Sequence, residues 1–323
     1  MKNILDEDIK SGNIRTVYLL YGEEDYLKEV YKKRLRAAIA GDDTMNVNTF
    51  AGRDIDVKEI INLSETMPFF AEKRLILVED SGFFKKGQED LASYIPKIPE
   101  TTCIVFVERE TDKRSRIYKA VRECGQAVEM ARQESRELAM WAARYLRDNG
   151  KSITEKTMDE LLLRTGPDMT NIRSELDKLI CYVKDADAVT SEDVREIVTA
   201  RTESRVFDMV DAIVSGKTET AMGLYRDLLA MREPPMRILF LIARQFSQLL
   251  AVKEMLQAGK DRGSIASALK VPPFAVRKLA AQAKNYSGEE ITARVTRAVE
   301  LEEAVKTGKM GDRIAVELLI AGK

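Results

Sequence analysis

The sequence predicts an α/β domain with a mostly parallel sheet, followed by all-helical domains. Up to about residue 130, short continuous apolar runs alternate with segments of helical periodicity, a pattern typical of parallel strands that helices cover on both faces. From Ser135 onward the strand-like runs stop and helical periodicity continues alone. At about 150 residues per domain, the 323 residues suggest two or three domains. We predict an α/β domain over 1–134, a small helical domain over 135–204 and a helical C-terminal domain over 205–323.

In the predicted α/β domain, each apolar run is interpreted as a strand and each periodic segment as a helix. The expected strands cover residues 16–21, 46–50, 74–78, 102–107 and 127–130, and the expected helices cover residues 26–39, 57–66 and 116–123.

Capping and breaking residues divide the rest of the chain into helices. Smaller helices are expected around residues 138–146, 154–164, 168–183 and 191–199. Longer ones follow from about residue 205, separated at Ser215-Gly216, Glu233-Pro234-Pro235, Gly259, Pro272-Pro273, Ser287-Gly288 and Gly308.

The composition excludes several kinds of chemistry. The chain has no histidine, so it has no Ser-His-Asp or Cys-His pair and no imidazole for a metal. Cys103, Cys124 and Cys181 are too scattered for a metal or redox motif, and we expect reduced thiols and no metal or cofactor. The N-terminus has no signal-peptide pattern, and the longest apolar run, residues 238–243, is far too short for a membrane span. We expect a cytoplasmic protein.

The first predicted strand leads into a helix at the place where a phosphate-binding loop, G-x-x-x-x-G-K-[ST], belongs. Gly22 and Lys28 have the spacing of its first glycine and its lysine. Leu27 replaces the second glycine, and Glu29 replaces the hydroxyl residue that would hold Mg²⁺.

The charge of this turn argues further against phosphate binding. Glu23, Glu24 and Asp25 occupy the space that the phosphate needs, and each carboxylate–phosphate pair ~4 Å apart would cost about 4 kcal/mol at an effective dielectric constant of 20. We therefore favour an ordinary acid-rich helix start and predict that the turn does not bind nucleotide. Without a phosphate to share the ion, Glu79 and Asp80 after the second apolar strand are interpreted as solvated turn acids.

A bulky apolar cluster lies between the helix expected at 57–66 and the strand expected at 74–78. It consists of Met67, Pro68, Phe69 and Phe70. Proline blocks continuation of the helix, and an apolar loop of this size is consistent with a binding role, because loops run over the surface. Taken alone, the residues fit either core packing or a partner-binding plug.

Two segments are locally basic although the formal net charge is −1. Residues 109–122 carry six basic and two acidic side chains, and residues 237–284 carry nine and two, with Phe240, Phe246 and Phe274 among them. Both fit solvated helix faces with aromatic core positions. A contact with a neighbouring subunit or with nucleic acid is the alternative, and neither segment has a specific signature for it.

Five short motifs, in order along essentially the whole chain, resemble the delta subunits of the bacterial DNA polymerase III clamp loader. They are VYLLYGEE at residues 17–24, PFFAEKR at 68–74, DKR at 112–114, SELDKL at 174–179 and KTG at 306–308. The family usually has Asp shortly before the last motif, whereas Glu302 and Glu303 stand nearby here.

The resemblance implies an AAA+-like α/β domain over 1–134, a helical lid over 135–204 and a helical collar over 205–323. It implies a subunit that binds and opens the sliding clamp, the beta subunit, without hydrolysing ATP. Met67, Pro68, Phe69 and Phe70 then form the clamp-binding element. The other expected partners are the ATPase subunits and delta-prime, through the collar, and primed DNA in the assembled complex.

Two other hypotheses stay open at this point. The chain could be an AAA+ nucleoside triphosphatase with a degenerate phosphate loop, in which case it would bind ATP through Lys28. It could also be a stand-alone DNA-binding protein that uses the basic collar segment, with binding that weakens steeply as salt rises.

Overall fold

The computed structural model describes residues 4–184 and 186–322. The chain separates into two compact units, with the division between Gln133 and Glu134. The second unit contains both the predicted lid and the predicted collar, so the division into three domains at 134 and 204 stays a prediction.

The first unit is built on a five-stranded parallel sheet with strand order β2-β3-β4-β1-β5. Its strands are β1 (Val17–Tyr21), β2 (Val47–Ala51), β3 (Arg74–Glu79), β4 (Thr102–Glu108) and β5 (Gln126–Glu129). The α/β fold class predicted from the apolar runs is therefore confirmed.

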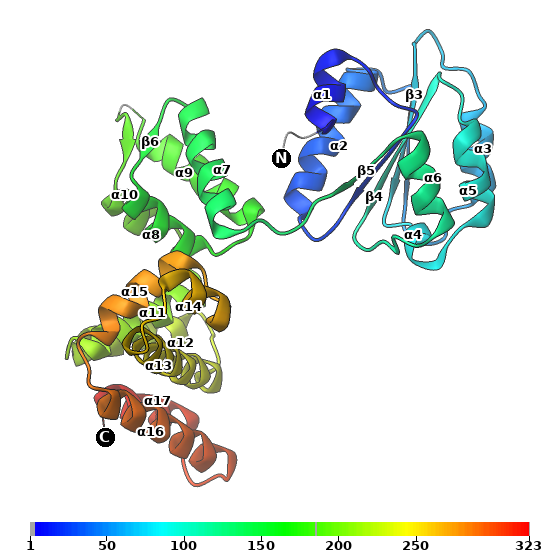
Figure 1. The fold of residues 1–323 in the computed structure, drawn as a ribbon. Helices are drawn as coiled ribbons and strands as arrows, with labels where there is room; N and C mark the ends of the chain where they lie inside the picture. Colours follow the sequence, from blue (N-terminus) through cyan, green and yellow to red (C-terminus); the bar gives the residue numbers. More distant parts are fainter. Residues whose placement is uncertain (1–3, 185, 323) are drawn as a thin grey trace. The chain divides into compact units, whose positions relative to one another are not determined.

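Helices cover both faces of this sheet, as Figure 1 shows. They are α1 (Ile4–Ser11), α2 (Asp25–Ala40), α3 (Val57–Ser64), α4 (Phe83–Lys86), α5 (Glu89–Tyr94), the 3-10 helix η1 (Ile95–Lys97) and α6 (Arg116–Cys124). The helices α2, α3 and α6 were predicted. The others are short, and none of them has enough turns to produce a clear apolar period.

Alternate residues of the strands pack into two cores, because successive side chains of a strand point to opposite faces. On one face, Leu20 packs in a cluster with Leu5 of α1 and Leu35 of α2. On the other face, Leu19 packs in a cluster with Ile117 of α6 and with side chains of α3 and α5. The continuous apolar runs follow from burial on both faces.

The second unit is almost entirely helical. Its first helices are α7 (Ser135–Asp148), α8 (Glu155–Thr165), α9 (Met169–Tyr182) and α10 (Ser191–Ile197). They are followed by α11 (Thr202–Val214), α12 (Thr218–Ala230), α13 (Pro235–Gln257), α14 (Arg262–Leu269), α15 (Pro273–Ala283), α16 (Gly288–Lys306) and α17 (Asp312–Ala321). Ile242, Phe246 and Leu249 of α13 lie fully buried in one core shared by α11 to α17.

The prediction that strands stop at Ser135 is wrong in one place. β6 (Ser152–Ile153) and β7 (Ala188–Val189) form a parallel pair. Each strand is followed directly by a threonine that caps the next helix, because Thr154 accepts from the main chain of α8 and Thr190 from that of α10. Two-residue strands are too short for any periodicity to reveal them.

Candidate functional site

The turn after β1 is closed by the fold itself. Gly22 has a φ of +124°, which favours glycine, and a Cβ there would lie 2.4 Å from the main-chain oxygen of Met130. The N–H of Gly22 donates to the oxygen of Glu108 over 3.2 Å, and that of Glu24 donates to Met130 over 2.9 Å. These two amides are engaged within the protein, whereas a phosphate loop directs its amides at the ligand.

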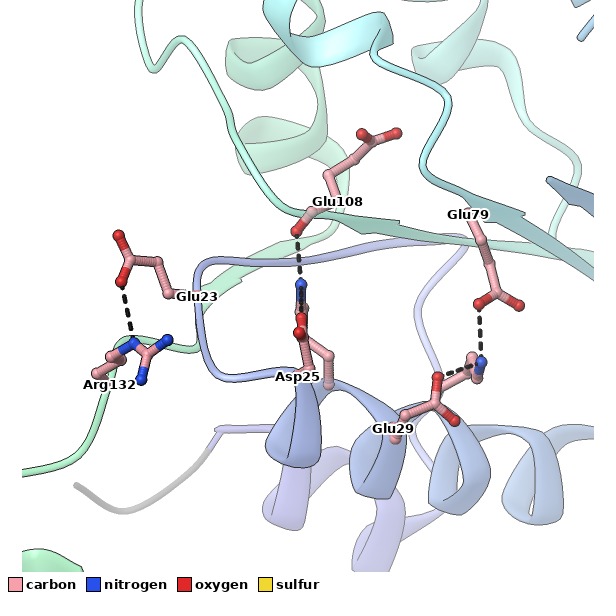
Figure 2. A network of polar contacts seen from close by, with 8 residues as sticks. Glu23, Asp25, Glu29, Glu79, Glu108 and Arg132 are labelled. Atoms are coloured by element: carbon pink, nitrogen blue, oxygen red, sulfur yellow. Dashed lines mark hydrogen bonds and ion pairs between the residues drawn. The ribbon is translucent and has the colours of Figure 1, made fainter. Parts of the chain in front are cut away.

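The lysine of this turn is already paired with an acid. Lys28 is 5% exposed, and its Nζ lies 2.9 Å from Asp25 Oδ1. It also donates to the main-chain oxygen of Glu108 over 3.4 Å. Glu23 in turn pairs with Arg132 (Figure 2), and the two charged groups lie 3.3 Å apart. The cation that would meet a phosphate is thus neutralised inside the turn.

The acid at the end of β3 is paired as well. The Lys32 ammonium lies 2.5 Å from Glu29 and 2.8 Å from Glu79, bridging the two carboxylates (Figure 2). Glu79 is therefore a salt-bridged residue and not merely a solvated turn acid. The structure brings the predicted residues together where β1 leads into α2, and their failure to bind nucleotide stays a prediction; they are Gly22, Glu23, Glu24, Asp25 and Lys28.

Glu108 holds the neighbouring turn in place with its side chain. Its buried carboxylate accepts hydrogen bonds from the N–H groups of Ser81 and Gly82 at 3.0 and 3.2 Å, and from the Ser81 hydroxyl. Burial raises the pKa of the Glu108 carboxyl, and these hydrogen bonds oppose part of that rise. In the sequence, Glu108 simply follows the apolar run 102–107, and that pattern does not indicate this role.

The aromatic loop lies at the other edge of the sheet. It connects α3 to the start of β3, whereas the turn at Gly22 follows the end of β1, and parallel strands begin at one edge and end at the other. Met67 is 72% exposed, Phe69 57% and Phe70 95%, while Pro68 is half-buried. The alternative that the two phenyl rings pack in a core is therefore wrong.

The exposed rings lie against each other in a defined geometry. The centroids of Phe69 and Phe70 are 4.6 Å apart with an interplanar angle of 80°, an edge-to-face pair. Phe70 has a φ of +50°, a left-handed conformation that is uncommon for a bulky residue.

Arg74 anchors the backbone of the same loop from inside. Its guanidinium is buried and donates to the main-chain oxygens of Thr66 and Met67, each over 3.2 Å, and to Asn48 Oδ1 over 3.1 Å. An arginine at the start of an apolar strand was a signal in the sequence, but its partners could not be named without the fold.

A buried asparagine contacts this loop. Asn46 is fully buried and bonded to the main chain of Phe69. The sequence pattern predicts Asn46 only as the first residue of a strand, because its contact is to a residue distant in sequence.

Some basic side chains of both segments form intramolecular ion pairs. In the first, Lys113 pairs with Glu129 at 2.8 Å, and Arg116 pairs with Glu89. In the second, Arg277 pairs with Glu155 at 2.9 Å and with Asp159. Phe246 is buried in the core as expected, whereas Phe240 is 56% exposed, so the expected core position is wrong for Phe240. The ion pairs fit the interpretation of these segments as solvated helix faces.

Among residues 4–184 and 186–322, no helix is both long and apolar enough to cross a membrane. In the same part of the chain, no three Cys, Asp or Glu residues are grouped so as to hold a metal ion.

A unit with a parallel sheet followed by a helical unit is the fold of a clamp-loader subunit of known structure, and the predicted α/β-plus-helical fold class is therefore confirmed. The family model described as "DNA polymerase III, delta subunit" matches residues 18–130, and that of the delta subunit's C-terminal domain matches residues 203–322. The chain belongs to the family of DNA polymerase III delta subunits.

Individual relatives agree with this assignment. The chain is 28% identical over 327 residues to DNA polymerase III subunit delta of Bacillus subtilis, covering 97% of this chain and 94% of that one. It is 22% identical over 258 residues to the probable subunit delta of Aquifex aeolicus, covering 76% and 73%. The solved structure of the Bacillus subtilis DNA clamp loader delta protein superimposes with a TM-score of 0.61 at 27% identity, covering 99% and 98%.

Proposed function

We propose that the chain binds the ring-shaped DNA sliding clamp through its aromatic loop and opens the ring for loading onto primed DNA, without hydrolysing ATP itself. The observation that carries this proposal is the exposure of Met67, Phe69 and Phe70 on one connection of the α/β unit. Adjacent, exposed aromatic side chains on a fixed backbone are typical of the anchors that fill a pocket of a partner.

The size of the expected contribution supports a docking role. Two phenyl rings that become desolvated in a clamp pocket can contribute ~2–4 kcal/mol each. Binding would open the ring only if the chain has a higher affinity for the open clamp than for the closed one. The loop would therefore hold the chain on the clamp, and other contacts of the chain would favour the open ring over the closed one.

The paired state of Lys28 supports a division of labour within the complex. Lys28 forms an ion pair with Asp25 and donates to the main-chain oxygen of Glu108, which makes it a poor phosphate ligand. We infer that ATP is bound and hydrolysed by companion subunits, the ATPase subunits, which join this chain and delta-prime through the predicted collar. The complex would act on primed DNA in the cytoplasm.

Binding to purified sliding clamp tests the proposal. We expect the wild-type chain to bind, and Phe69→Ala/Phe70→Ala to bind at least about a hundredfold more weakly. Phe240→Ala is the matched control, because Phe240 has nearly the same exposed fraction as Phe69 but lies on α13. If the double variant binds as tightly as wild type, the site is wrong, and if wild type does not bind, the function is wrong.

The two alternative functions make opposite predictions for the isolated chain. A nucleoside triphosphatase would bind ATP and lose this binding with Lys28→Ala, whereas we expect no ATP binding in equilibrium dialysis. A stand-alone DNA-binding protein would bind duplex or primed DNA tightly, with an affinity that falls steeply with salt. We expect only weak DNA binding without the other subunits.

A further inference from the structure

We propose that Asn46 is a positioning residue of the clamp-binding loop, which it holds in its docking conformation before the clamp arrives. The inference rests on the proposed clamp binding through Phe69 and Phe70. It adds a residue that contacts neither the solvent nor the clamp but acts through the main chain of Phe69.

One buried amide satisfies both main-chain polar groups of Phe69. The N–H of Phe69 donates to Asn46 Oδ1 over 2.7 Å, and Asn46 Nδ2 donates to the oxygen of Phe69 over 2.8 Å. Asn46 comes just before β2, and its own main-chain oxygen accepts from Leu75 N at the start of β3 over 2.8 Å. Asn46 thereby ties the loop to the same sheet edge from which β2 and β3 begin.

A carboxylate fixes which way the amide points. Asn46 Nδ2 also donates to Asp43 Oδ2 over 2.6 Å. Because an ionised carboxylate only accepts hydrogen bonds, the nitrogen must face Asp43, and the oxygen is left to accept from Phe69. The hydrogen bond from Asn46 lowers the pKa of Asp43, with a further contribution from the N–H of Met45, so the carboxylate is ionised near neutral pH.

The loop that Asn46 and Arg74 hold contains a backbone conformation that it would not keep without these contacts. Phe70, with its φ of +50°, follows directly after the fixed Phe69, and such a conformation in a bulky residue persists only where the surrounding structure enforces it. Asn46 on one side and Arg74 on the other hold the backbone, while the two rings remain exposed. A loop ordered in advance does not lose this freedom on binding, which raises its affinity.

Substitution of Asn46 tests the inference. Asn46→Asp keeps the size and the acceptor, but it lacks the donor to Phe69 and places a second carboxylate against Asp43. We expect it to lower clamp affinity roughly tenfold, the effect of one or two residues of lost order. The acceptor of the Phe69 N–H remains in this variant, but the loop loses one of its two hydrogen bonds to residue 46 and should open more often. The amide hydrogen of Phe69 should therefore exchange with solvent faster. Asp43→Ala, which removes the partner that orients the amide, should have the same effects to a smaller degree.

Tyr18→Phe is the stability control. Tyr18 is buried on β1, which β4 separates from β3, and its hydroxyl donates to Asp8. The variant loses a buried hydrogen bond of the same unit without touching the loop, so it should unfold at a lower temperature and bind the clamp normally.

The outcomes separate the inference from the proposed function. If wild type binds the clamp and Asn46→Asp and Asp43→Ala bind as tightly, the positioning role is wrong and the docking role stands. Weaker binding with unchanged exchange of the Phe69 amide also overturns the positioning role. If Asn46→Asp fails to fold, Asp43→Ala decides by the same two measurements. A wild-type chain that does not bind overturns both proposals.

Discussion

Gly22 is the residue whose substitution most directly tests the closed turn after β1. Gly22→Ala would combine a φ of +124° with a Cβ 2.4 Å from the main chain of Met130. The contact is with main-chain atoms, which cannot turn aside as a flexible side chain can. The backbone must therefore move, and we expect a loss of about 3 kcal/mol in the free energy of unfolding. Gly52→Ala is the matched control, because Gly52 has a φ of +92° and open space at its Cβ.

Chemical denaturation of both variants provides the measurement. Gly52→Ala should lose only about 1 kcal/mol, the strain of its backbone conformation. Equal losses in the two variants would show that the contact with Met130 does not restrict this turn.

Glu108 gives the first unit a pH dependence of known sign. Because its pKa is raised by burial, the folded chain binds this proton more tightly than the unfolded chain, and stability from this group rises as pH falls through the folded pKa. Glu108→Gln removes the titration. The variant loses hydrogen bonds at every pH, but we expect its deficit relative to wild type to be smaller at about pH 8 than at about pH 5.

Thermal unfolding of wild type and Glu108→Gln across this range measures the difference. A deficit that stays constant with pH contradicts the burial of a raised-pKa carboxyl at this position.

The exposed pair Phe69 and Phe70 marks the limit of sequence reasoning at the residue scale. Adjacent aromatic residues after a proline fit a core as well as a surface, because burial depends on neighbours that are distant in sequence. Asn46 and Arg74 hold the backbone of this loop through contacts that join segments at the starts of different strands. The pair of Lys28 with Asp25 was not predicted, although the two residues lie only three positions apart in the same helix.

Among the elements, those with several residues buried on both faces were predicted best. The strands β1, β3 and β4 have continuous apolar runs and were placed within a residue or two of their observed bounds. The helices α1, α4 and α5 and the pair β6–β7 are too short to produce a period. They are stabilised by contacts with other elements, which a single pattern does not contain.

The helices α8 and α15 are joined by a salt bridge whose removal should loosen them. Arg277 of α15 contacts Glu155 and Asp159 of α8, and burial raises the pKa of Asp159 while Arg277 opposes the rise. Because these side chains are partly exposed, we expect Arg277→Met to lower stability by only about 1 kcal/mol. Its effect should be local, as faster hydrogen exchange in α8 and α15.

Lys306→Met is the control for this prediction. Lys306 pairs with Glu302 one turn away within α16, an exposed pair that joins no second element, so we expect almost no change in exchange. If both variants behave alike, the ion pair does not contribute to packing between the two helices.

Taken as a whole, the molecule combines properties that fit the proposed role of a subunit that docks on another protein. It has no histidine and a formal net charge of −1. Many of its basic side chains are paired within the chain, as Lys28, Lys113 and Arg277 illustrate. Its exposed aromatic loop and its closed phosphate-loop turn lie at opposite edges of one sheet. The proposed docking surface is therefore separate from the turn where a phosphate-binding loop would belong.

This separation leads to a prediction for the whole molecule: clamp opening should need no nucleotide. A protein that prefers the open ring shifts an existing equilibrium between closed and open rings by its differential affinity, and no hydrolysis enters that balance. We expect saturating wild-type chain to raise the open fraction of a clamp with fluorescent donor and acceptor dyes across one ring interface, equally with and without ATP. Phe240→Ala should do the same, whereas Phe69→Ala/Phe70→Ala should leave the ring closed at the same concentration. If the chain binds through its aromatic loop but the ring opens only after the ATPase subunits and ATP are added, the prediction is wrong. The chain would then bind the clamp without opening it.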